Sequence, residues 1–404
     1  SLAISHDLFT SLNWGWYNRM MASASGFFNA ITSALGGGKN SGSVLGIDIG
    51  SSSIKIVQLR PQKGSAILET YGELALGPYA GLSVGKATKL PVDKIGGALL
   101  DLMKEANVTA KQAGISIPFA SSLISILNLP NVDDEHLKRM IPIEARKYIP
   151  VSVSEVLLDW FVIPQDDKAP DAFDRIEKET MAQKRGREVL LAAIHNETLQ
   201  AFKTIAETAA LSVSFFEIEI FSTIRSSLGH GVAPVAVVDM GASTTKIYVV
   251  ERGVVRFSHL LNVGGQHMTE SLARSLEWTF EKAERMKRET GLNDSPTYTK
   301  TENELMHQTM RNNLTRVFTE TNRVLLSYGK RYNKQVSHVV LTGGGASLPG
   351  IQDAAKESLH ADIENANPFA RVEAPAFLEE VLSNIGPGFS VATGAALRKL
   401  SQSS

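Results

Sequence analysis

The feature that most constrains the fold of this chain is an internal repeat. Residues 44–59 have the pattern of a buried strand, a Gly/Ser turn and a second, alternating strand, and residues 235–250 repeat it. In register, the residues Asp48, Gly50, Ser52, Lys55 and Ile56 match Asp239, Gly241, Ser243, Lys246 and Ile247. A repeat at about half the chain length predicts two similar domains that face each other, each beginning with a β-hairpin.

The turn of each hairpin has the composition of an anion-binding loop. Glycine lets a ligand approach the backbone closely, and successive N–H groups with Ser or Thr hydroxyls form a nest for phosphate oxygens. A carboxylate at the strand end, such as Asp48 or Asp239, is suited to hold Mg²⁺ through the water ligands of the ion. One such motif also occurs in ordinary turns. Two in register favour a phosphate site between the repeats.

A third glycine-rich turn follows a buried strand near the C-terminal end. Residues 339–342 lead into three consecutive glycines at positions 343–345. Such a run is costly in backbone entropy unless something must lie flat against the backbone, and an adenosine ring system is a suitable group. The alternative is an ordinary turn from strand to helix.

Composition narrows the function classes. The 404 residues include 41 basic and 42 acidic side chains, so the chain lacks the basic excess of a dedicated nucleic-acid-binding protein, and we expect no nucleic-acid partner. The absence of cysteine excludes disulfides, thiolate zinc sites and a cysteine nucleophile. Neither a secretory signal nor a run of about 20 apolar residues is apparent, so no transmembrane span is predicted.

The first 43 residues carry a different pattern. Apolar side chains recur at helical spacing from Leu8 to Leu35, which predicts an amphipathic helix or helix pair, and residues 36–43 have the composition of a flexible Gly/Ser linker. Three placements stay open: packing on the chain's own domain, docking on a partner subunit, or lying in a membrane interface. The last is disfavoured because the segment has few basic residues.

Together these motifs resemble those of the actin/Hsp70/sugar-kinase superfamily of ATP-binding proteins, through the two hairpins, the glycine turn at 342–346 and the run at 392–398. More narrowly, the chain resembles the PilM family of type IV pilus assembly proteins, relatives of the cell-division protein FtsA. The stretches that carry this second resemblance are 46–52, 144–150, 264–265 with 283–287, and 367–369. The resemblance covers about residues 44–400. It implies an α/β, actin-like (ribonuclease H-like, duplicated) two-domain ATPase fold with an inserted PilM/FtsA-type subdomain.

The resemblance implies a cleft between the two domains that holds ATP and Mg²⁺. On the phosphate side it implies contacts from Gly50, Ser51, Ser52, Ser53, Lys55, Gly241, Ser243, Thr244 and Lys246, with Asp48 and Asp239 facing the hydration shell of Mg²⁺. On the nucleoside side it implies Gly265, Glu284, Lys287, Gly343, Gly344, Gly345 and Ala346. Strand alternation can equally direct Lys55 to solvent, and the helix of Glu284 and Lys287 can equally be a solvated face.

Hydrolysis needs a group that orients the attacking water. Glu219, in the segment that joins the two halves, is the candidate, with a structural hydrogen-bonding role as its alternative. The resemblance implies ATP binding, and we expect hydrolysis to be weak or absent.

The expected organisation has four parts: an extension at 1–43, domain 1A at 44–84 and 188–233, an inserted subdomain 1C at 85–187, and domain 2 at 234–404 with a helical part at about 268–335. Within the insertion we expect a helix over 92–106, a strand pair over 113–129 and a helix over 133–148. A highly charged, exposed excursion follows from 165 to 188. The resemblance implies that the insertion lines a groove for a partner peptide.

The function implied by the resemblance is a cytoplasmic ATP-binding scaffold of a type IV pilus or related type II secretion machine, peripheral to the inner membrane. It would bind the cytoplasmic N-terminus of a PilN-like inner-membrane protein and couple it to the assembly motor. Motor ATPases, the platform protein and further copies in an oligomer or ring are additional expected partners. The alternatives are an FtsA-like cell-division filament protein and a phosphotransferase of the same superfamily, although no acceptor pocket is apparent.

Overall fold

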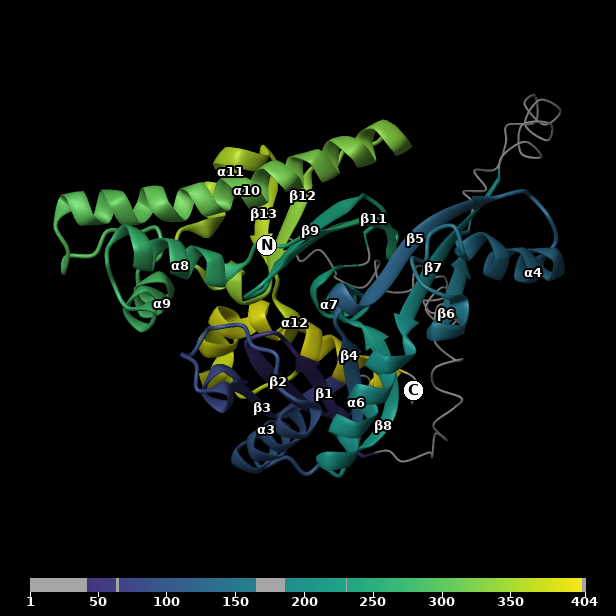
Figure 1. Cartoon of the computed structure of the whole chain (residues 1–404), viewed down its shortest axis with the longest axis horizontal. Coiled ribbons are helices and arrows are strands. Elements are labelled where there is room, and N and C mark those ends of the chain that lie inside the picture. Colours follow the sequence, from purple (N-terminus) through teal and green to yellow (C-terminus); the bar gives the residue numbers. More distant parts are fainter. Residues whose placement is uncertain (1–41, 63–64, 165–185, 230, 402–404) are drawn as a thin grey trace, which may run out of the picture. The chain divides into compact units, whose positions relative to one another are not determined.

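The computed structural model describes residues 42–62, 65–164, 186–229 and 231–401 (Figure 1). They divide into two compact units, a small one within residues 123–194 and a main one formed by the remaining residues. The predicted N-terminal amphipathic helix and most of the charged excursion lie outside the described residues. No described helix has both the length and the apolar character needed to cross a membrane.

The main unit contains two five-stranded sheets of the same topology. In sheet order, the first consists of β3 (Ser65–Ala75), β2 (Ser53–Gln62), β1 (Val44–Ile49), β4 (Gln112–Ile117) and β8 (Ser212–Ile218). The second consists of β11 (Val254–Leu261), β10 (Thr245–Glu251), β9 (Val235–Met240), β12 (His338–Thr342) and β13 (Asp362–Asn365). In this order, the first three strands of each sheet alternate in direction. The last two strands run parallel to the third, which is β1 in the first sheet and β9 in the second. The sequence repeat is thus a repeat of a whole sheet.

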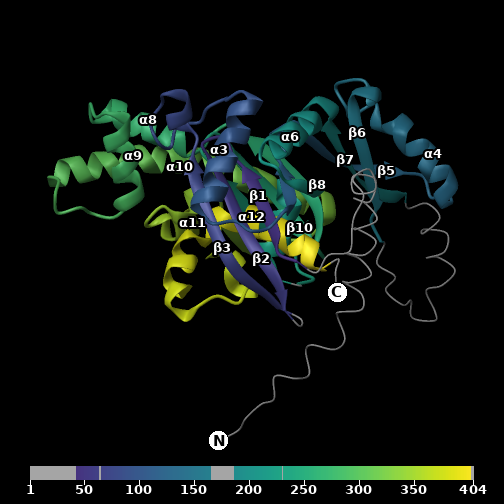
Figure 2. The same ribbon diagram turned by 90° about the horizontal axis from the view of Figure 1, so that it is seen from below.

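Helices cover both faces of the first sheet. The helices α3 (Val92–Glu105) and α6 (Asn196–Thr208) pack together on one face, where Leu102 lies against Gly72 and Ile56. The opposite face, which carries Val57 and Leu59, packs against α12 (Glu379–Ser401), with α7 (Glu219–Ser227) beside it. Figure 2 shows α12 behind the strands β1 and β2. Apolar residues at successive positions of these strands allow both faces to be buried.

Four helices from the second half of the chain cover one face of the second sheet. They are α8 (Gly265–Ser275), α9 (Phe280–Glu289), α10 (Lys300–Tyr332) and α11 (Ile351–Leu359). Val238 and Ile247 belong to the core on this face. Because side chains alternate along a strand, Asp239 and Lys246 lie on the other face.

The helices α7 and α12 cross at a very short distance. A Cβ atom on Gly394 of α12 would lie 1.9 Å from the backbone oxygen of Ser222 in α7, so only glycine fits at this point. Next to the crossing, the Ser226 hydroxyl donates to the Ser390 carbonyl oxygen at 2.7 Å. The close approach positions α7, whose first residue is Glu219.

Within its described residues, the small unit has a three-stranded sheet and the helix α4 (Asp134–Ala145). Its strands lie in the order β5 (Ser122–Leu129), β7 (Arg187–His195) and β6 (Val156–Val162). The side chain of Asp133 caps α4 by accepting from the N–H groups of residues 135 and 136. The core between helix and sheet includes Leu127, Leu137, Ile141, Val189 and Leu191.

Two expectations for residues 85–187 are wrong. The helix α3 and the strand β4 belong to the main unit, and the strands expected to pair over 113–129 lie in different sheets. The reason is that β4 is buried on both faces and lies parallel between β1 and β8, as a central strand must. A short turn over Phe119–Ser121 separates it from β5. The other predicted domain boundaries stay predictions.

Candidate functional site

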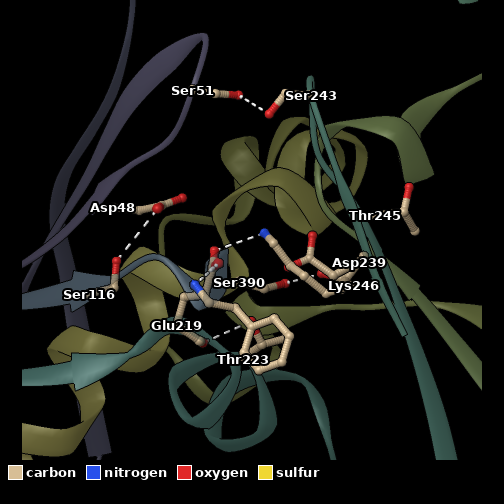
Figure 3. A network of polar contacts seen from close by, with 12 residues as sticks. Asp48, Ser51, Ser116, Glu219, Thr223, Asp239, Ser243, Thr245, Lys246 and Ser390 are labelled. Atoms are coloured by element: carbon tan, nitrogen blue, oxygen red, sulfur yellow. Dashed lines mark hydrogen bonds and ion pairs between the residues drawn. The ribbon is translucent and has the colours of Figure 1, made fainter. Parts of the chain in front are cut away.

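The turns of the two repeated hairpins have the same geometry and meet at their tips. The Gly50 N–H donates to the Ser53 carbonyl oxygen at 3.0 Å, and the Gly241 N–H donates to the Thr244 carbonyl oxygen at 2.9 Å. The Ser243 hydroxyl donates to the Ser51 hydroxyl at 3.0 Å, as Figure 3 shows. The residues predicted on the phosphate side, 50–53 and 241–244, therefore lie in two facing turns.

Beneath these turns lies a cluster of buried charges. The Lys246 ammonium group donates to Glu219 Oε2 at 2.8 Å and to Asp239 Oδ2 at 3.1 Å (Figure 3). Glu219 Oε1 accepts the backbone N–H of Phe119 at 2.6 Å. Burial alone would lower the pKa of Lys246, but Asp239 and Glu219 hold that pKa well above its ordinary value. Lys246 is thus a fixed positive charge.

Asp48 lies opposite this cluster and is held loosely. Its Oδ1 accepts the Ser116 hydroxyl at 3.5 Å. Desolvation of the carboxyl group raises the pKa of Asp48 to about 6, although Lys55 lowers it, and the negative charge of Glu219 adds to the increase. A carboxylate in this setting has free oxygens that can accept from water.

Lys55 occupies the position in the first hairpin that Lys246 has in the second, but it has different partners. Its ammonium group donates to Ser53 Oγ at 3.0 Å and pairs with Glu73 at 3.2 Å. Its side chain is 14% exposed, so it does not simply point to solvent. The two hairpins therefore share the same backbone geometry but differ in how their lysines pair with carboxylates.

Three of the residues predicted on the nucleoside side, Gly265, Glu284 and Lys287, come together at the N-terminal end of α8. Glu284 Oε2 accepts from the Lys287 ammonium group at 2.5 Å and from the Thr269 hydroxyl at 2.6 Å. Lys287 also donates to the Gly265 carbonyl oxygen at 3.2 Å. Burial would raise the pKa of Glu284, but Lys287 and its other donors lower it. Since Glu284 is 5% exposed, it is not part of a solvated helix face.

Packing against β9 explains two of the three glycines at 343–345. A Cβ atom on Gly343, whose φ is +78°, would lie 2.5 Å from Asp239 Oδ1, and one on Gly345 would lie 2.6 Å from the Cβ of Met240. Only Gly344 is exposed, with open space where a side chain would start. The next residue, Ala346, is fully buried in the core of the second sheet. Of this turn, Gly344 is the position open to a ligand.

The residues present fit a magnesium ion held through water. Within the ranges that the structure describes, no three His, Asp or Glu side chains are close enough to hold a metal ion directly. Asp48 has oxygens free to accept from the water ligands of Mg²⁺, which keeps several of them in proteins. Asp239 is engaged by Lys246. The fit is therefore better at Asp48 than at Asp239.

A strap formed by residues 83–88, which no sequence pattern predicts, joins the two halves of the main unit. Ser83 contacts the Glu281 carboxylate, and the Ala87 N–H donates to Gln266 Oε1 at 2.7 Å. The Thr88 N–H donates to the Ser51 carbonyl oxygen at 2.9 Å, which ties the strap to the first turn. Gly85, with φ of +88°, lies against the Glu284 carboxyl group. Residues 83–88 contain no recognisable motif. The presence of Gly85 was the one sequence signal for an unusual backbone conformation in this segment.

Comparisons with known proteins agree with this architecture. The family model of the type IV pilus assembly protein PilM matches residues 46–400. A solved PilM–PilN type IV pilus biogenesis complex is similar with a TM-score of 0.72 and 21% identity, over 90% of this chain and 99% of that chain. The ethanolamine utilization protein EutJ from Carboxydothermus hydrogenoformans is similar with a TM-score of 0.50 and 16% identity, over 94% of this chain and 99% of that one.

Curated relatives are cell division proteins FtsA. The protein from Agrobacterium fabrum is 29% identical over 177 residues, and the match covers 39% of each chain. This chain thus spans about two fifths of the length of the first relatives it matches. The protein from Enterococcus faecalis is 22% identical over 353 residues, covering 80% of this chain and 78% of the relative. The predicted actin-like fold is confirmed, and the chain belongs to the family of the type IV pilus assembly protein PilM.

Proposed function

We propose that this protein is a nucleotide-binding scaffold of a type IV pilus machine or a related type II secretion machine. The observation that carries the proposal is the pair of facing turns joined by Ser51 and Ser243. Each turn offers backbone N–H groups and hydroxyls, and phosphate groups between the turns would accept from both. The hydrogen bond between the two serines would then be replaced by bonds to phosphate.

The nucleotide we propose is ATP with Mg²⁺, which would neutralise part of the phosphate charge. Asp48 would accept hydrogen bonds from the water ligands of the ion. Lys287 and Glu284 would contact the ribose next to Gly265. Gly344 would lie next to the base. Both carboxylate oxygens of Glu219 already accept hydrogen bonds, from Phe119 and Lys246, which supports binding with little hydrolysis.

We also propose that the small unit binds the cytoplasmic N-terminus of a PilN-like inner-membrane protein. Its edge strands carry alternate apolar residues on the face away from α4, and these are partly exposed: Ile124 and Ile126 in β5, and Leu157 and Phe161 in β6. A partly exposed apolar sheet face is suited to an amphipathic peptide. The similar solved structure is a PilM–PilN complex, which supports the choice of partner.

This partner would place the protein in the cytoplasm, peripheral to the inner membrane. Changes in nucleotide state would then reach the assembly motor and platform protein through the PilN-like partner. An oligomer or ring of several copies is part of the same proposal.

The experiment is a calorimetric titration of the full chain with Mg-ATP, with phosphate release followed in the same samples. It is run with and without a synthetic peptide of the PilN-like N-terminus. We expect saturable ATP binding, negligible phosphate release and an ATP affinity that changes when the peptide is bound. Asp48→Asn is expected to weaken Mg-ATP binding at least tenfold. The matched control is Asp362→Asn, which changes an exposed aspartate of β13.

Each part of the proposal can fail separately. No binding of ATP in any condition would refute the nucleotide site. ATP binding that is independent of the peptide would refute the coupling. Steady phosphate release that the peptide does not alter would favour the phosphotransferase, and ATP-dependent sedimentation of long polymers would favour the FtsA-like filament.

A further inference from the structure

The two hairpins differ in what their lysines do. Lys55 and Lys246 occupy equivalent positions, each directly across the ladder from an aspartate. Lys55 pairs with Glu73, outside the hairpin turn, whereas Lys246 pairs with its own cross-strand partner Asp239. The second hairpin therefore carries an internal counter-ion that the first one lacks.

The pairing of Lys246 is tight and shielded from water. The side chains of Lys246, Glu219 and Asp239 are 12%, 9% and 5% exposed. The ammonium group lies 2.8 Å from Glu219 and 3.1 Å from Asp239, so one cation bridges two carboxylates. Buried charges are stable only when paired, and breaking such a pair leaves an uncompensated charge. The bridge is thus a fixed part of the site.

We propose that Lys246 takes the place of a divalent cation on the Asp239 side of the site. This inference rests on the proposed nucleotide site and deepens it: a Mg²⁺ ion that arrives with the nucleotide meets Asp48 alone, not a symmetric pair of aspartates. The ammonium group neutralises Asp239 and Glu219 permanently and keeps both from the hydration shell of the ion.

Size and charge both support this assignment. A magnesium ion that contacts a carboxylate through a water ligand lies about 4 Å from the carboxylate oxygen. The ammonium nitrogen, at 2.8–3.1 Å, already fills the space between the two carboxylates that such a hydrated ion would need. A second cation there would also be repelled by Lys246. Asp48, by contrast, has only the long 3.5 Å bond from Ser116 within the site.

The first test measures thermal unfolding of the full chain with and without Mg²⁺, in the absence of nucleotide. Lys246→Met removes the charge at similar length and leaves Asp239 and Glu219 without their cation. We expect about 10 mM Mg²⁺ to raise the melting temperature of this variant by several degrees, because the ion then binds only the folded state. The wild type and Lys246→Arg, which keeps the charge, should shift by less than about 1 °C.

The control is Lys334→Met, which removes another lysine paired with a buried carboxylate. Its partner Glu251 is a single acid that also faces Arg256. Loss of this lysine should lower stability without creating a response to Mg²⁺. A Lys246→Met protein whose melting temperature does not respond to Mg²⁺, or a wild type that responds as strongly as the variant, overturns the proposal.

The second test keeps Lys246 and therefore does not depend on the folding of Lys246→Met. Affinity for a fluorescent ATP analogue is measured in Mg²⁺ and in EDTA for Asp48→Asn and Asp239→Asn. We expect Asp48→Asn to abolish most of the gain from Mg²⁺ and Asp239→Asn to change it less than about threefold. Equal losses in the two variants overturn the proposal. If the wild type binds no nucleotide in either buffer, the proposed function fails, while the Mg²⁺ melting test still decides the role of Lys246.

Discussion

Replacing Asp48 by asparagine should make the folded protein more stable at neutral pH, even though it weakens the proposed site. The folded chain holds the Asp48 carboxyl group where desolvation raises its pKa to about 6, from an ordinary value of 3.8. An ionised carboxylate is therefore disfavoured in the folded state relative to the unfolded one. Asparagine keeps the shape and the ability to accept from Ser116, and it carries no charge.

The sign and size follow from the two pKa values. Between about pH 4 and pH 6 the folded state binds more protons at Asp48 than the unfolded state, so the stability of the wild type falls as pH rises through this window. The difference between the two values corresponds to about 3 kcal/mol above pH 6. Because Asp48 keeps some exposure to solvent, we expect a gain of about 1–3 kcal/mol for Asp48→Asn at pH 7.5. The gain should vanish at pH 4.

The assay is denaturant unfolding of the full chain, followed by circular dichroism at pH 4.0, 5.0, 6.0 and 7.5. Asp362→Asn serves as the control, because this exposed aspartate is far from the hairpin turns in sequence and should change stability by less than about 0.5 kcal/mol at every pH. If Asp48→Asn is equally or less stable than the wild type at pH 7.5, or if its gain does not depend on pH, the argument from desolvation is refuted.

Two further predictions concern glycines in close contacts. Gly394→Ala should lower the free energy of unfolding by about 2–4 kcal/mol, measured by thermal unfolding, because the added Cβ would lie 1.9 Å from the Ser222 oxygen. The control is Gly97→Ala in α3, where a Cβ would meet open space, and it should be neutral or slightly stabilising. Gly85→Ala should displace the strap, since its Cβ would lie 2.6 Å from the Glu284 carboxyl carbon, and should speed release of a fluorescent ATP analogue in stopped flow. An unchanged release rate would mean that the strap does not enclose the nucleoside.

The repeat predicted more of this fold than any other feature of the sequence. Periodicity of two and a shared Asp-x-Gly turn are local properties, so both hairpins followed from the residues themselves. The helices over 92–106 and 133–148 also appear, as α3 and α4, with ends shifted by at most three residues. Local patterns thus predicted the elements well.

What the sequence did not predict depends on contacts between distant residues. Residues 113–129 contain two apolar strands, and nothing local tells which sheet each one joins; β4 joins the main sheet because both of its faces are buried there. The partner of Lys246 was likewise open, since alternation fixes the face of the side chain and not which carboxylate it meets. Glu219 is 27 residues away in sequence from Lys246, and only the fold brings them together.

The buried charges around α7 connect the candidate site to the packing of α12. Glu217, fully buried at the end of β8, accepts from Arg225 of α7 and Arg398 of α12, and these arginines hold its pKa below the ordinary value although burial alone would raise it. Two residues later Glu219 begins α7 and is bridged by Lys246. The short helix α7 is thus held at its first residue by the second hairpin and along its length by α12.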